Sequence, residues 1–201
     1  MNYPSFFDSI EVIKVADPLS AVLGAFDGGV YEFTFLDAVK SAGHSCPTLA
    51  GAYLVTLEGL KALYPNALAV RGEIKVEFKE PMEEGVTGVI SNVVSQITGA
   101  TEKSGFKGLA GKFARHSLMS FSANIKSSAR FTRVDNGKSV DVYYDPSSIG
   151  GSPKMQQLMQ KMMGGMADAQ EIKEFGGLWQ DRVKRIFENT ATVIRVEEVK
   201  K

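Results

Sequence analysis

One cysteine and one histidine stand two positions apart in the segment SAGHSCPTLAGAYL, residues 41–54. Cys46 is the only cysteine of the 201-residue chain, and His44 is one of its two histidines. Proline is favoured at the first position of a helix, so Pro47 predicts a helix that begins there with Cys46 as its N-cap. The sulfur would then face the free N–H groups of the first turn and the positive end of the helix dipole, which favour the thiolate.

A thiolate and an imidazole are good ligands for zinc and related transition ions. Because one intervening residue lets both side chains point to the same side, the segment predicts a zinc pocket at His44 and Cys46. Zinc needs at least three protein ligands, and His116, the other histidine, is the candidate third, with Asp and Glu side chains as further candidates. Three alternatives stay open: a structural cysteine beside a hydrogen-bonded histidine, a nucleophilic Cys–His pair, and haem ligation by Cys46.

A second candidate site is the loop TEKSGFKGLAGK, residues 101–112. Its glycines free the backbone amides, and Lys103 and Lys107 add positive charge, so the loop could cradle an anionic ligand. The spacing differs from that of a phosphate-binding loop, and a solvated loop is the competing interpretation.

Hydrophobic periodicity predicts the elements that must position these residues. Helices are predicted at 35–44, 47–64, 86–99, 154–163 and 168–189, strands at 74–78, 129–134, 139–144 and 191–199, and a type I′ turn at Asn136-Gly137. Helices and hairpins without regular strand–helix alternation favour an α+β fold, with helices packed on a mixed, largely antiparallel sheet. We expect a single core domain over residues 1–201.

The composition argues against two classes of partner, nucleic acid and membrane, and indicates the cellular compartment. Lys and Arg together balance Asp and Glu at 23 each, so no global charge favours nucleic acid or an anionic membrane surface. One cysteine suits a reducing compartment, and no apolar run reaches the roughly 20 residues that span a bilayer. The start MNYPSFFDSI lacks the form of a secretory signal. We therefore expect a cytoplasmic protein that binds neither nucleic acid nor membrane.

A methionine stripe predicts an apolar contact surface. Its members recur at helical spacing: Met155, Met159, Met162, Met163 and Met166. Thioethers can bind copper(I), but adaptable apolar packing is their commoner use. Together with the apolar last helix, around Phe175, Trp179, Val183, Ile186 and Phe187, the stripe predicts a homodimer.

Four segments carry a family resemblance over roughly residues 35–190. GHSCPTLAGAYL resembles the Gly-His-x-Cys-Pro-Gly-Leu-Ala-x-Gly segment of the formylmethanofuran dehydrogenase E-subunit-like family. NVVSQITGATEKSG, AGKFARHSLMSF and FGGLWQDRVKRIFEN are similar to later blocks of that family, in the same order. The resemblance implies an α+β core, usually dimeric, with a metal pocket around His-x-Cys. Some relatives also have a C-terminal zinc finger, which this sequence cannot form because no cysteine follows Cys46.

The sequence departs from the family where relatives carry further sulfur and imidazole. Ala100 replaces the cysteine of Thr-Gly-Cys-Thr, another family cysteine falls near Val89, a frequent histidine falls at Ala42, and Thr48 replaces the glycine after Cys-Pro. The resemblance thus implies a poorer or different metal site. Two functions are predicted: a zinc protein that senses or carries the metal or uses it on a small molecule, and a non-catalytic module that binds an anion or haem in the same pocket.

Overall fold

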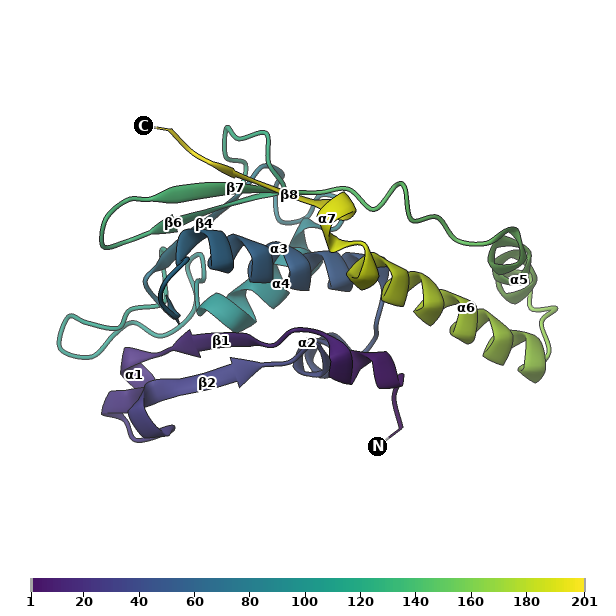
Figure 1. The fold of residues 1–201 in the computed structure, drawn as a ribbon, viewed down its shortest axis with the longest axis horizontal. Coiled ribbons are helices and arrows are strands. Elements are labelled where there is room, and N and C mark those ends of the chain that lie inside the picture. The colour runs from purple at the N-terminus through teal and green to yellow at the C-terminus, as the bar shows by residue number, and fades with distance from the viewer. Residues whose placement is uncertain (1, 201) are drawn as a thin grey trace.

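Helix α3 (Pro47–Leu63) is the centre of the fold, which the computed structural model describes for residues 2–200. It lies between two sheets, with the larger sheet above and the N-terminal sheet below it in the view of Figure 1. The other helices are α1 (Pro18–Val22), α2 (Phe35–Ala42), α4 (Thr87–Thr98), α5 (Pro153–Met163), α6 (Ala169–Glu188) and α7 (Thr190–Val193), with 3-10 turns at Ser5–Ser9 and Asp27–Gly29. The predicted α+β class is confirmed.

The strands form two mixed sheets where the sequence predicted one. They are β1 (Ile13–Ala16), β2 (Val30–Phe33), β3 (Ala69–Val70), β4 (Ile74–Phe78), β5 (Met119–Ser120), β6 (Ala129–Arg133), β7 (Ser139–Tyr144) and β8 (Ile194–Glu198). The larger sheet has the order β5-β4-β6-β7-β8 and is antiparallel except for the β4–β5 pair. The smaller sheet, β2-β1-β3, pairs β1 antiparallel to β2 and parallel to β3.

Two glycines let α3 approach the larger sheet closely. A Cβ on Gly51 would lie 2.1 Å from Cε1 of Tyr144, and one on Gly59 would lie 2.9 Å from the ring of Phe131. Both aromatic rings therefore pack directly on the helix backbone. These glycines lower the helix propensity of α3, but they allow the close helix–sheet contact of the core.

The turn between β6 and β7 differs from the predicted type I′ turn. Gly137 has a φ of 70°, but Asn136 is not among the non-glycine residues with positive φ. The N–H of Gly137 donates to the carbonyl of Arg133, and a five-residue loop, 134–138, joins the strands. This pattern fits a longer hairpin loop in which one glycine alone takes the left-handed conformation.

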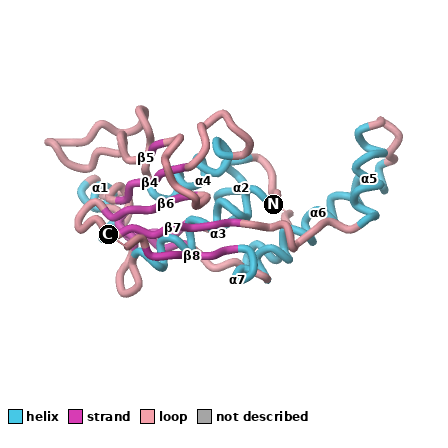
Figure 2. Tube along the Cα trace, turned by 90° about the horizontal axis from the view of Figure 1, so that it is seen from above, coloured by secondary structure: helices cyan, strands magenta, loops and turns pink. Residues whose placement is uncertain are grey.

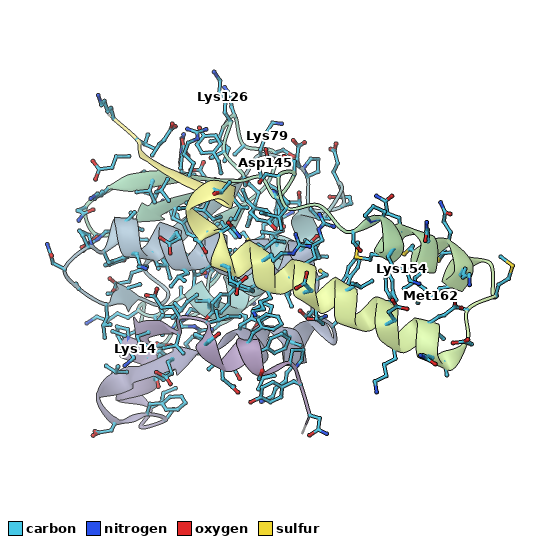
Figure 3. All side chains as sticks on the ribbon, turned by 45° about the vertical axis from the view of Figure 1, so that its right-hand side comes forward. Lys14, Lys79, Lys126, Asp145, Lys154 and Met162 are labelled. Carbon is cyan, nitrogen blue, oxygen red and sulfur yellow. The ribbon has the colours of Figure 1, made fainter. Side chains whose placement is uncertain are left out.

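Helices α5 and α6 form an arm that projects from the body (Figures 1 and 2). The C-terminal half of α6 packs against the core through the buried Val183 and Ile186. Figure 3 shows Lys154 and Met162 on the arm, and Lys154 pairs with Glu174 across the two helices at 3.6 Å. The methionine stripe divides: Met155 is buried, Met159 and Met162 are half-buried, and Met163 and Met166 at the tip are 83% and 73% exposed.

A buried charge cluster fastens the loop 101–118 to the N-terminal sheet. The carboxylate of Asp17 accepts hydrogen bonds from Nη2 of Arg115 at 2.5 Å, Nη1 of Arg71 at 3.2 Å and the hydroxyl of Tyr31 at 2.8 Å. Asp17 and Arg115 are only 4% and 5% exposed. Nε and Nη1 of Arg115 have no hydrogen-bond partner among residues 2–200, so Asp17 is the group that offsets its charge.

Within residues 2–200, none of the helices combines the length and the apolar character needed to cross a bilayer.

Candidate functional site

Cys46 is the N-cap of α3, as the sequence predicted. Its sulfur accepts a hydrogen bond from the backbone N–H of Leu49 at 3.4 Å. The segment around it is covered from two sides, because the hydroxyl of Tyr144 donates to the carbonyl of Pro47 and the indole of Trp179 donates to the carbonyl of Ser45. Burial, the largest cause, raises the pKa of Tyr144 and keeps its hydroxyl protonated as a donor. The thiol is half-buried at this junction of α3, β7 and α6.

His44 lies just after the end of α2, where Gly43 takes the left-handed conformation of a helix C-cap (φ 75°). Its Nδ1 is 3.1 Å from the carbonyl oxygen of Ala42. A carbonyl can only accept, so Nδ1 carries the hydrogen and the neutral ring keeps its lone pair on Nε2. Nε2 has no hydrogen-bond partner among residues 2–200 and is free to accept a donor or to bind a metal ion.

His44 opens onto a hollow between α2 and α4, here called the α2–α4 cleft, with a volume of about 500 Å³. The cleft is lined by Ala38, Ser41, Ala42, His44, Val89, Asn92, Val93, Ser95 and Gln96. Hydroxyl and amide groups dominate its polar surface, and no lysine, arginine, aspartate or glutamate is present in the lining. Such a surface recognises a ligand by hydrogen bonds rather than by net charge.

Gln96 lines the same cleft, but its acceptor oxygen is buried. Its Nε2 lies 3.5 Å from the carbonyl oxygen of Asp37, a contact that requires the amide nitrogen on that side. Its Oε1 is buried and has no hydrogen-bond partner within residues 2–200. Nε2 of the exposed His44 is thus the acceptor that the cleft presents to a ligand, whereas Oε1 of Gln96 is buried behind the lining.

The three predicted metal ligands do not come together. Cys46 is not among the residues that line the α2–α4 cleft, and neither is His116, which lies in the loop 101–118 with its Nδ1 3.0 Å from the hydroxyl of Ser117. No group of three His, Cys, Asp or Glu side chains suited to hold a metal ion occurs in residues 2–200. His116 therefore has no geometric support as a third ligand, and the zinc prediction lacks a complete ligand set in this conformation.

Two of the positions at which the sequence departs from the family that it resembles lie in the same cleft. Ala42 and Val89, where relatives are expected to carry a histidine and a cysteine, both line it beside His44. Ala100, at the other cysteine position, is fully buried. The lining of the cleft therefore has one imidazole, that of His44, among hydroxyl and amide groups.

The two predicted anion-binding lysines separate in the structure. Lys103 lines a second hollow of about 240 Å³, which shares Asn92 and Ser95 with the α2–α4 cleft, whereas Lys107 is exposed and lines neither of these hollows. Sequence reasoning missed Asn92, Ser95 and Gln96, which form the polar face of α4 at these sites. Their three- and four-residue spacing places them on one side of the helix, but such a face is typical of solvent exposure.

Known protein families give no match to this chain. No family model matches it, and no curated protein matches its sequence. The resemblance to the formylmethanofuran dehydrogenase E-subunit-like family stays a prediction, and the function has to be inferred from the cleft itself.

Proposed function

We propose that this protein is a non-catalytic binding module that takes up a small molecule with N–H or O–H donors in the α2–α4 cleft. The observation that carries the proposal is the acceptor Nε2 of His44, which is exposed in the cleft and has no hydrogen-bond partner among residues 2–200, beside the hydroxyl and amide side chains of the lining. A ligand that donates to Nε2 replaces the hydrogen bond of this nitrogen to water. A binding role is favoured because His44 is hydrogen-bonded to a backbone carbonyl and to no side-chain nucleophile among residues 2–200.

Nitrogen-15 NMR of the imidazoles tests this proposal. The chain has only two histidines, so a His116→Ala variant assigns the His44 signals. Acetamide, which carries N–H donors, should shift the Nε2 signal of His44 and the side-chain amide signals of Gln96. Acetate, which has no donor at neutral pH, should leave them in place, and His44→Ala should abolish the response of Gln96. An equal response to both probes, or none to millimolar acetamide, would contradict the proposal.

A zinc ion at Nε2 of His44 is the second candidate function. It is supported by the bond from Nδ1 to the carbonyl of Ala42, since metal-bound histidines usually donate their other ring N–H to such a group. With one imidazole in the cleft, the other ligands would be water, groups of the small molecule, or the Cys46 thiolate after a rearrangement. Haem is less well supported, because the cleft walls are rich in hydroxyl and amide groups.

Calorimetry with zinc and tag-free protein separates these ligand sets. His44→Ala should weaken zinc binding on the order of 10-fold or more. Cys46→Ser decides whether the thiolate is a ligand, and His116→Ala is the matched control that should leave binding unchanged. Wild-type protein that takes up no zinc would remove this candidate and leave the first one untouched.

A further inference from the structure

The α2–α4 cleft continues across α4 into the second hollow. Asn92 and Ser95 line both cavities, so the same two side chains form the ridge between them. A third hollow of about 620 Å³ shares Met82, Glu102 and Lys103 with the second. The three hollows are therefore neighbours, and the surface that they form along the polar face of α4 is here called the α4 groove.

The character of the α4 groove changes along its length. The end at His44 has the exposed acceptor Nε2 and no lysine, arginine or carboxylate in its lining. The first lysine along it is Lys103, which forms no ion pair with any residue of the described chain 2–200. The two ends of the groove thus favour different ligand groups: a hydrogen-bond donor at the His44 end and an anion at the Lys103 end.

Hydrogen-bond donors surround Lys103. The hydroxyls of Ser95 and Ser104 and the amide of Asn92 lie in the same hollow, and an ammonium with several neutral donors suits an oxyanion. Glu102 is the one carboxylate in this hollow, and Glu83 joins it in the third. These carboxylates oppose an anion, so the lysine and the neutral donors must supply the attraction.

We propose that the α4 groove binds an elongated molecule with an amide or amine at its His44 end and a carboxylate or phosphate at its Lys103 end. This inference rests on the proposed function of the α2–α4 cleft and adds the class of ligand. The distance to be bridged is on the order of 10 Å, the width of a helix with its side chains. A ligand that reaches both ends donates a hydrogen bond to Nε2 of His44 at one end and pairs with the free ammonium at the other.

A series of ω-amido acids tests the inference: succinamate, glutaramate and adipamate, measured by calorimetry. Affinity should rise along the series, because longer members reach both ends of the groove. Lys103→Met should weaken adipamate binding about 10- to 100-fold, as expected for losing a charged hydrogen bond. Lys107→Met, on the same loop but outside the groove, is the matched control and should have no effect. Glu102→Gln should strengthen binding, because it removes the opposing charge.

A double-mutant cycle completes the test. His44→Ala and Lys103→Met should be coupled when adipamate is the ligand and independent when acetamide is. Affinity that does not depend on length, or equal effects of Lys103→Met and Lys107→Met, would overturn the elongated ligand while leaving the α2–α4 cleft intact. Loss of the acetamide response itself would overturn the proposed function. Comparing γ-aminobutyrate with its phosphonate analogue distinguishes a carboxylate end from a phosphate end.

Discussion

Replacing Asp17 with asparagine should destabilise this protein severely, because the carboxylate offsets two guanidinium groups. Arg115 is almost wholly buried, and it and Arg71 form no other ion pair in residues 2–200. Asparagine keeps the size of the side chain but removes its charge, which leaves Arg115 buried without a counterion. Breaking a buried pair by removing one partner costs about 3–5 kcal/mol. A chain of this length loses about 2–4 °C of Tm per kcal/mol, so Tm should fall by about 6–20 °C.

Urea unfolding measures the effect, with the fluorescence of the single tryptophan, Trp179, as the signal. The matched control is Asp181→Asn, which removes the same charge from an exposed pair with Arg185 on α6. That change should cost less than about 1 kcal/mol, as exposed pairs do. If Asp17→Asn cost no more than Asp181→Asn, the reasoning from burial would be refuted.

Three more predictions follow from the same structure. Burial raises the pKa of Asp17, but the hydrogen bond from Tyr31 and the charge of Arg115 outweigh it and hold the pKa below its ordinary value. The stability that this carboxylate contributes should therefore be complete above about pH 5 and be lost as the pH falls through the folded-state pKa. An acid titration of unfolding should show this loss in wild type but not in Asp17→Asn. Gly51→Ala should cost about 1–3 kcal/mol in urea, because its Cβ meets the ring of Tyr144, whereas Gly177→Ala on α6, with nothing within 4 Å, should stabilise by up to about 1 kcal/mol. The homodimer predicted from the methionine stripe would be formed through the exposed tip of the α5–α6 arm; light scattering at micromolar concentration should then give twice the chain mass, and a monomer mass would contradict it.

The helices were largely predictable from sequence, and the N-terminal sheet was not. Pro47 and the apolar spacing fixed α3 and its N-cap, and periodicity located α4 to within a residue at each end. Strands β1 and β2 have four residues each and β3 has two, which is too short for alternation to stand out. The three strands are also far apart in the sequence, so only their pairing in space defines them as a sheet.

Of the residues that line the candidate site, the sequence predicted His44 but not the polar residues of α4. His44 stood out because histidine is rare in this chain, but the expectation that it shares a pocket with Cys46 assumed that both side chains leave the segment on one side. In the structure His44 lines the α2–α4 cleft, whereas Cys46 is outside its lining. Asn92 and Gln96 were indistinguishable from a solvated helix face until α2 packed against α4. No local pattern carries that information, because it depends on which helices become neighbours.

The buried ion pair between Arg115 and Asp17 has a consequence for hydrogen exchange in the loop 101–118. The loop 101–118 is rich in glycine and exposed, so it would ordinarily open on its own many times before the whole domain unfolds. However, the N–H of Thr101 donates to the carbonyl of Arg115, and the N–H of Arg115 donates to that of Phe106, which ties the loop backbone to the residue whose side chain is buried against Asp17. We expect these two amide protons to exchange more slowly than the other amides of the loop, because Arg115 is attached to the core through its side chain. Lys103 is two residues after Thr101, so its end of the α4 groove should keep its shape while the N-terminal sheet stays folded.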